Sequence, residues 1–177
     1  MKIPSKKLWG YIIPTLFLIA GAIFLMPKSD GGLSIDLDSF MRSDYKTSGY
    51  FNGGKMTDSL DVRTVRWHKH EEYERLVFDI YAWGGVFGDS PYQQTNETGL
   101  YQIGKEEEGS LSLDGELSGY RDFSAKMPTL NKSKLIKKMQ VFPNHENSFL
   151  FTLTLKSPAS YKVFTLKNPA RIIIDIK

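Results

Sequence analysis

The sequence predicts an all-β fold, a β-sandwich of two small sheets with a pseudo-twofold internal repeat, preceded by one N-terminal transmembrane helix. Three observations lead to this prediction. An uncharged apolar run occupies residues 8–26, alternation of apolar and polar residues dominates beyond residue 61, and one short motif occurs near residue 75 and again near residue 171. With 177 residues in all, the chain leaves room for one ordinary domain with one hydrophobic core.

The first predicted element is a membrane anchor. Leu8–Met26 contains nineteen residues without a charge, and a helix of that length, at about 1.5 Å per residue, nearly matches a hydrocarbon core of about 30 Å. Lys2, Lys6 and Lys7 precede the run, which favours a cytoplasmic N-terminus and an extracytoplasmic domain. The alternative is a cleaved signal peptide, because Ala20–Ala22 has the small-x-small form of a cleavage site. We therefore expect a single-pass protein of the cell membrane.

Composition divides the chain into three segments and excludes several functions. We expect cytoplasmic lysines and the anchor (or signal peptide) in residues 1–27, a flexible tether rich in Gly, Ser and Asp in residues 28–61, and the β-sandwich domain in residues 62–177. The net charge of +3 comes from the N-terminal lysines, so it gives no reason to expect a nucleic-acid ligand. The absence of cysteine excludes disulfides, thiolate zinc sites and cysteine nucleophiles.

The exported domain is predicted from eight stretches in which apolar and polar residues alternate, as they do in strands with one buried face. In chain order they are Val62–Trp67, Arg75–Ala82, Tyr92–Ile103, Ser110–Leu117, Leu135–Phe142, Phe149–Leu155, Tyr161–Leu166 and Arg171–Ile176. Turn-forming residues 143–147 predict a hairpin between the fifth and sixth stretches. Residues 117–134 show no regular pattern, and we expect at most one helical turn there.

The repeated motif is an arginine, three apolar residues, an aspartate and an isoleucine. It starts at Arg75 and again at Arg171, and each copy is the second arm of a predicted hairpin. We expect two similar halves that each bury one face against the other. Within a strand, Arg75 and Asp79, like Arg171 and Asp175, lie about 13 Å apart on one face. Each side chain therefore needs a partner on another strand, and we interpret the four residues as a structural motif of cross-strand ion pairs.

These stretches resemble a known family. The residues that carry the resemblance are Val62–Arg66, Glu74–Asp79 and, most specifically, Tyr161–Asp175. They resemble the AMIN and AMIN-like domains of bacterial cell envelopes, over Val62 to Lys177. The resemblance implies a β-sandwich module that is not itself catalytic. Domains of this family accompany N-acetylmuramoyl-L-alanine amidases and type IV pilus secretins, where they are associated with peptidoglycan binding and with placing their partner in the envelope.

Two groups of residues are candidates for ligand contact. Trp83 and Tyr92 flank a glycine-rich loop, where flat rings beside small residues can stack on sugars. The alternative is that Trp83 and Phe87 close the end of the sandwich. Lys134, Lys137 and Lys138 belong to a basic patch in the last part of the chain, which can attract an anionic wall polymer or an acidic partner. The alternative for the lysines is an ordinary solvated face.

A metal site is a weaker hypothesis. His68 and His70 are spaced to point the same way on an extended strand, and Glu71 and Glu72 follow them. They fall, however, where we predict a hairpin loop, in which polar residues collect anyway. The sequence contains no nucleophile elbow, phosphate-binding loop or HExxH motif. We therefore expect no enzyme activity, no bound metal and no cofactor.

Together these features predict a membrane-anchored binding module that recognises a cell-wall glycan, peptidoglycan in particular, or an envelope protein, with a targeting or scaffolding role. The expected ligand groove is lined by Trp83, Tyr92 and the lysines. One alternative is an assembly subunit of an envelope machine that pairs an exposed sheet edge with a partner and has no glycan affinity. The other is a metal-dependent hydrolase built on His68 and His70. Contact with the membrane is expected through residues 8–26, and neither nucleic acid nor a small-molecule cofactor is expected as a partner.

Overall fold

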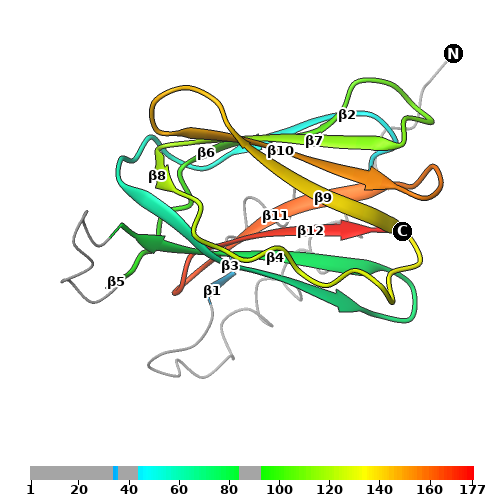
Figure 1. Ribbon diagram of the computed structural model, residues 1–177, viewed down its shortest axis with the longest axis horizontal. Coiled ribbons are helices and arrows are strands. Elements are labelled where there is room, and N and C mark those ends of the chain that lie inside the picture. The colour runs from blue at the N-terminus through cyan, green and yellow to red at the C-terminus, as the bar shows by residue number, and fades with distance from the viewer. Residues whose placement is uncertain (1–33, 36–43, 84–92) are drawn as a thin grey trace, which may run out of the picture. The chain divides into compact units, whose positions relative to one another are not determined.

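A computed structural model describes residues 34–35, 44–83 and 93–177 of the chain (Figure 1). All regular secondary structure within these ranges is β-strand, which confirms the predicted all-β class. None of the described residues forms a helix long and apolar enough to cross a membrane. The predicted anchor in residues 8–26 lies outside the described ranges.

The strands form two sheets that lie over one another (Figure 1). The larger sheet has the order β1 (Ser34–Ile35), β11 (Tyr161–Lys167), β12 (Arg171–Ile176), β4 (Glu74–Ala82), β3 (Leu60–Lys69) and β8 (Tyr120–Asp122), and β5 (Gln93–Gln94) also pairs with β4. The five-stranded sheet has the order β2 (Gly49–Gly53), β6 (Leu100–Lys105), β7 (Ser112–Ser118), β10 (Ser148–Leu155) and β9 (Ile136–Pro143). Two sheets were predicted, and this part of the prediction is confirmed.

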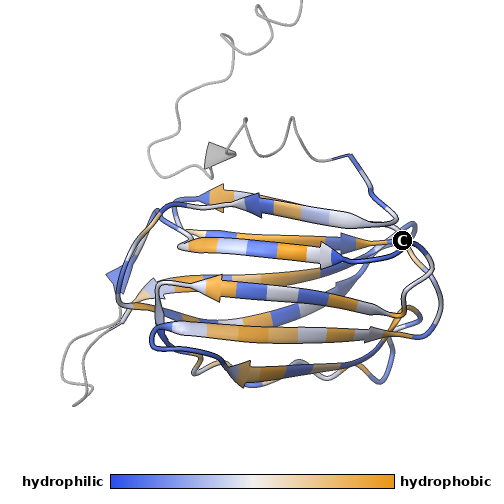
Figure 2. Cartoon of the chain, turned by 90° about the horizontal axis from the view of Figure 1, so that it is seen from above, coloured by the Kyte–Doolittle hydropathy of each residue, from blue (hydrophilic) through white to orange (hydrophobic). Residues whose placement is uncertain are grey.

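The core fills the space between the sheets, because alternate residues of each strand point inward. Figure 2 shows this alternation as hydrophobic and hydrophilic bands along the strands. In β10, Phe151, Leu153 and Leu155 are buried, and in β4, Leu76 and Phe78 are buried. The rings of Phe78 and Phe151 join the two sheets, with their centroids 5.1 Å apart. Each such large apolar side chain contributes about 1.5–3 kcal/mol when it is fully buried.

The two copies of the repeated motif do not face each other across this core, so that part of the prediction is wrong. They are the adjacent antiparallel strands β4 and β12 of the larger sheet. In their register Asp79 lies opposite Arg171 and Arg75 lies opposite Asp175. Antiparallel pairing of two copies thus sets each arginine beside the aspartate of the other copy. The twofold character is therefore local to one sheet.

The folded domain begins earlier in the chain than residue 62 and overlaps the predicted tether of residues 28–61. Phe51 of β2 is buried in the core. Lys46 and Tyr161 exchange two backbone hydrogen bonds of 2.8 and 2.9 Å, and the Tyr161 hydroxyl donates to the Gly49 carbonyl oxygen. Alternation in the sequence did not predict this strand, because β2 has one inward apolar residue and two glycines among five residues.

Two further differences concern the middle of the chain. The predicted strand from Tyr92 to Ile103 is divided between β5 and β6, which belong to different sheets, and Tyr92 itself lies outside the described residues. The irregular stretch of residues 117–134 contains the short strand β8, paired parallel to β3, and a single turn in which the Ser133 amide donates to the Leu130 carbonyl oxygen at 2.9 Å. The Tyr120 side chain of β8 is fully buried, and its hydroxyl donates to the Thr98 carbonyl oxygen. A strand of three residues is too short to produce a detectable alternation.

Candidate functional site

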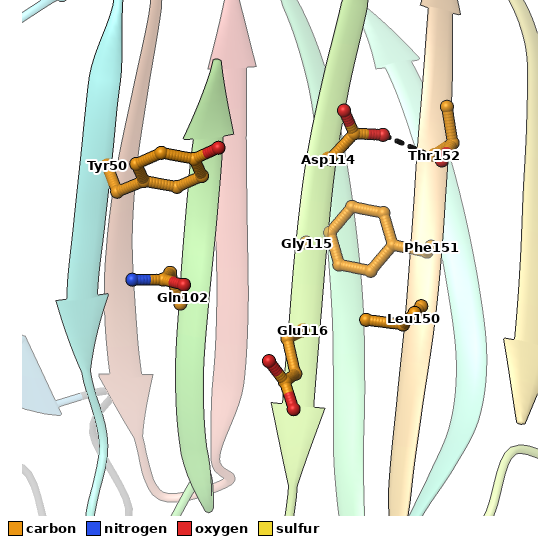
Figure 3. A pocket seen from close by; sticks show the side chains of 8 residues that line it. All are labelled: Tyr50, Gln102, Asp114, Gly115, Glu116, Leu150, Phe151 and Thr152. Carbon is orange, nitrogen blue, oxygen red and sulfur yellow. Dashed lines mark hydrogen bonds between the residues drawn. The ribbon is translucent and has the colours of Figure 1, made fainter. Parts of the chain in front are cut away.

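The outer face of the five-stranded sheet carries a hollow of about 250 Å³ that is open to solvent (Figure 3). Residues from four adjacent strands line it. They are Tyr50 from β2, Gln102 from β6, Asp114, Gly115 and Glu116 from β7, and Leu150, Phe151 and Thr152 from β10.

The strand register explains why these residues meet. Gln102, Glu116 and Leu150 lie directly opposite one another across three strands. Asp114 lies opposite Thr152 in the neighbouring row. Alternate residues of a strand share a face, so both rows point away from the core. The site therefore stands on the sheet itself and not on loops.

Glycines shape the hollow and its floor. Gly104 stands in register between Tyr50 and Asp114 and brings no side chain to fill the space between them. A Cβ atom at Gly104 would lie 2.1 Å from the Gly49 carbonyl oxygen, so β2 could not approach as closely. A Cβ atom at Gly115 would lie 2.2 Å from the ring of Phe151, which packs in its place.

The polar groups of the hollow are largely available to a ligand. No residue in the described part of the chain forms a hydrogen bond to the Gln102 amide or to the Tyr50 hydroxyl. Asp114 accepts hydrogen bonds from Thr152 Oγ1 at 2.7 Å and from Ser112 Oγ at 3.0 Å. Glu116 Oε1 accepts one long bond of 3.3 Å, from the side chain of Asn144. Asp114 is thus held in place, whereas Glu116 is free to turn toward a ligand.

Two apolar side chains stand beside these polar groups. Tyr50 and Leu150 are each 39% exposed, and Phe142, which lies opposite Leu150 on β9, is 47% exposed. Exposed apolar groups next to amide and carboxylate groups can receive a ligand that has both apolar and hydrogen-bonding faces. A sugar ring is such a ligand.

The ligand residues predicted from the sequence are not brought together. Trp83 follows the end of β4, where its ring packs 4.6 Å from the Arg121 guanidinium and its amide donates to Ser59. Lys134 is held near the beginning of β4, because its amide donates to the Glu74 carboxylate. The nine residues of β4 span about 30 Å. Trp83 and Lys134 therefore cannot line one groove.

The other two predicted lysines are exposed residues of β9, the last strand of the five-stranded sheet. Lys138 lies opposite Thr154 and shares the outer face with the hollow, although it does not line it. Lys137 lies beside it at the edge of the sheet. Tyr92, the second predicted aromatic residue, lies outside the described residues.

The arginines and aspartates of the repeated motif form ion pairs on the outer face of the larger sheet. Arg75 makes two bonds to Asp175, of 2.6 and 2.8 Å, and Arg171 Nε lies 3.0 Å from an Asp79 oxygen. Arg66 adds a second arginine to Asp79 at 2.7 Å. The bond to Asp175 raises the pKa of Arg75 above its ordinary value. The cross-strand partners that the sequence required are present, and the geometry is that of a structural clamp.

The histidines do not form a metal centre with their neighbours. Among the described residues, no three histidine, aspartate or glutamate side chains come together in a way that could hold a metal ion. The ring of His70 instead stacks on Tyr73, with centroids 4.3 Å apart. His68 stands at an exposed position of β3, opposite Arg75. The hydrolase hypothesis therefore gains no support from the geometry.

Sequence reasoning missed all the residues of the hollow. Asp114, Glu116, Leu150 and Thr152 occupy alternate positions of two predicted strands, so their exposure was foreseeable. Nothing in the sequence indicated that these two strands are neighbours. Tyr50 was assigned to the tether.

The fold and the hollow define a small all-β domain of two sheets that presents an open hollow on one sheet face. The comparison with known families gives this class a name. The AMIN-like domain matches residues 60–177, about two thirds of the chain, and the chain belongs to the AMIN-like family. Neither the curated proteins nor the solved structures contain a significant match to this sequence.

Proposed function

We propose that this protein is a non-catalytic binding module of the bacterial cell envelope, and that it binds the glycan of peptidoglycan through the hollow on the five-stranded sheet. Family membership supports the coarser part of the proposal, an envelope-associated and peptidoglycan-related module. The observation that carries the finer part is the hollow itself, in which exposed Tyr50 and Leu150 lie beside two carboxylates and the Gln102 amide, to which no described residue forms a hydrogen bond.

The chemistry of the hollow suits a sugar ring. The C–H face of a pyranose can pack on the Tyr50 ring and on Leu150, which removes apolar surface from water. Its hydroxyl groups can donate to Asp114 and Glu116, and the Gln102 amide can both donate and accept. Because the hollow stands on paired strands and Asp114 is held by Thr152 and Ser112, much of the site is positioned before a ligand arrives, which lowers the entropic cost of binding.

The proposal includes a place for the protein in the cell. The apolar run of residues 8–26, with lysines before it, would act as the membrane anchor and hold the domain on the outer side of the membrane. A targeting or scaffolding role follows, because an anchored glycan-binding domain would link the membrane to the wall.

Sedimentation with purified sacculi tests the proposal. The full chain in detergent is mixed with sacculi, and its bound fraction is compared with that of Tyr50→Ala and Leu150→Ser. We expect each substitution to weaken binding about tenfold, which corresponds to a loss of about 1.4 kcal/mol. Met127→Ala is the matched control, since Met127 is exposed (42%) but does not line the hollow. Retention of both variants as strong as that of the unchanged chain would exclude this face as the glycan site.

A further inference from the structure

We propose that the hollow selects an amino sugar whose nitrogen is unacetylated and therefore positively charged, in preference to its N-acetylated or anionic counterparts. This inference rests on the proposed function, because it concerns the glycan that the same hollow would take. It follows from the charges of the hollow and from the hydrogen-bonding capacity of its carboxylates.

The hollow has two negative charges and no positive one among its lining residues. Asp114 and Glu116 are separated by a single residue on β7 and point to the same side, so their Cα atoms are about 7 Å apart. Neither carboxylate forms an ion pair with a residue in the described part of the chain. The cation on this face that the register places nearest is Lys138, which lies beside Thr154 outside the hollow. A cationic ligand would supply the missing counter-charge.

The hydrogen-bonding capacity of the two carboxylates also favours a cationic ligand. An ionised carboxylate only accepts hydrogen bonds, and its two oxygens offer about four sites. Asp114 uses part of this capacity for Thr152 and Ser112, and Glu116 uses one site for Asn144. The remaining sites can take the three donors of an ammonium group, and such charge-assisted bonds are about twice as strong as neutral ones. An acetamide nitrogen offers one donor and no charge.

The size of the hollow and its apolar part favour a sugar as the carrier of the ammonium group. Its volume of about 250 Å³ lies below the roughly 300–1,000 Å³ of pockets for drug-sized ligands, so it suits one ring better than a folded peptide. Tyr50 and Leu150 provide the apolar surface on which such a ring can lie, within the same hollow as the carboxylates. A flexible peptide amine would use the charges and leave this surface uncovered.

The test compares two oligosaccharides that differ only at nitrogen. Binding of the full chain in detergent to glucosamine oligomers and to N-acetylglucosamine oligomers of equal length is measured by calorimetry, at low salt and at a pH where the amine is protonated. We expect at least tenfold tighter binding of glucosamine oligomers, and we expect added salt to reduce this preference. Equal affinities, or tighter binding of the acetylated oligomer, would overturn the inference.

Variants separate this inference from the proposed function. Asp114→Asn combined with Glu116→Gln keeps the size of both side chains and removes their charges, so we expect the preference for glucosamine to vanish while N-acetylglucosamine oligomers still bind. Tyr50→Ala should weaken both ligands. If both oligomers bind equally and depend on Tyr50, the glycan site stands and the charge selection is wrong. If neither oligomer nor sacculi bind, both proposals fail.

Acetylated sacculi and a peptide complete the experiment. Treating sacculi with acetic anhydride blocks their free amines, and we expect retention of the full chain to fall after treatment. A lysine-containing peptide that binds more tightly than glucosamine oligomers would overturn the choice of a sugar as the occupant. Circular dichroism of each variant verifies that the fold is unchanged.

Discussion

Glu74 is a buried carboxylate that joins the loop before β9 to the start of β4. It is 3% exposed and accepts hydrogen bonds from the side chains of Trp67 and Ser133 and from the amides of Lys134 and Leu135. Burial alone would raise the pKa of Glu74, but these hydrogen bonds outweigh burial and hold the pKa below its ordinary value. The charged form of Glu74 therefore stabilises the fold.

Replacing Glu74 should destabilise the protein strongly. In Glu74→Ala the indole N–H, the hydroxyl and the two amides all lose their acceptor, and we expect the free energy of unfolding to fall by about 2–4 kcal/mol. Urea denaturation followed by circular dichroism measures the change. The control is Glu71→Ala, because Glu71 is exposed and its loss should alter stability by less than about 0.5 kcal/mol. Equal stability of the two variants would contradict this account.

Glu74 also makes the free energy of unfolding depend on pH, and the direction of this dependence can be predicted. Because the pKa of Glu74 is lower in the folded than in the unfolded chain, its contribution is complete above the unfolded value of 4.5 and is lost as the pH falls through the lower folded-state pKa. The stability difference between the unchanged protein and Glu74→Gln should thus shrink when urea titrations are repeated below that range. A difference that grows on acidification would refute the assignment.

At the scale of elements, the five-stranded sheet has two edge strands, β2 and β9, and β9 is the longer one to which an assembly partner could pair. Exposed Lys137 and Lys138 lie side by side on it, and Pro143 ends it without a backbone donor. Lysine and proline at sheet edges are common protection against pairing with another chain. The edge strands of the larger sheet, β1 and β8, have two and three residues. Strand addition at β9, β1 or β8 therefore gains less support from the structure than binding through a sheet face.

Removing the protection of β9 should change the association state. Lys137→Val with Lys138→Thr leaves an uncharged edge of high strand propensity, and we expect dimers or larger species in sedimentation velocity at concentrations where the unchanged protein remains monodisperse. The control is Lys132→Thr with Lys126→Thr, which removes as much charge from exposed positions outside the strand. If both double variants associate equally, net charge and not the edge is responsible.

Sequence patterns could not predict which strands are neighbours in the sheets. Alternation assigned Leu76 and Phe78, like Ile172 and Ile174, to inward positions, and these residues are buried. The same alternation is satisfied whether β4 and β12 face each other or pair edge to edge. Hydrogen-bonded pairing and the two arginine–aspartate contacts decided for one sheet. The repeated motif was thus recognised correctly, but the predicted arrangement of its two copies in space was wrong.

At the scale of the whole molecule, residues 44–59 are part of the domain, although they lie before the family match. The match to the AMIN-like family begins at residue 60, whereas β2 completes the five-stranded sheet and Lys46 bridges to β11. Phe51 and Tyr161 meet edge to face there, with centroids 5.8 Å apart. Without this segment, β6 would become an edge and the core beside Ile103 would open to water.

A truncation series should therefore show a sharp boundary. A chain of residues 44–177 is expected to melt cooperatively, close to the temperature of the full chain. A chain of residues 60–177, which contains the whole family match, should melt at least 10 °C lower or aggregate, since a loss of about 1 kcal/mol lowers the melting temperature of a domain of this size by roughly 3–5 °C. Differential scanning calorimetry measures both. Equal melting temperatures would show that β2 is dispensable.

The candidate site depends on the whole molecule in the same way. Asp114 and Glu116 could be placed on a solvent-facing side of one strand from sequence alone. Tyr50 could not be placed in this way, because a short strand with two glycines has the composition of a linker. Its cross-strand partner, Gly104, is more than fifty residues away in the chain. The prediction that Trp83 and the lysines line one groove was wrong for a related reason. Trp83 and Lys134 both lie close to β4, but at its opposite ends.

The sequence by itself determined the all-β class, the inward face of most strands, the family and the need of each motif arginine for an aspartate on another strand, because these depend on local alternation and on residue identity. Only the tertiary structure decided which strands are neighbours, that β2 belongs to the domain, and that Tyr50, Gln102, Glu116 and Leu150 share one hollow. The physical reason is that contacts between residues far apart in the chain are selected by the packing of the complete core, and no single segment contains that information.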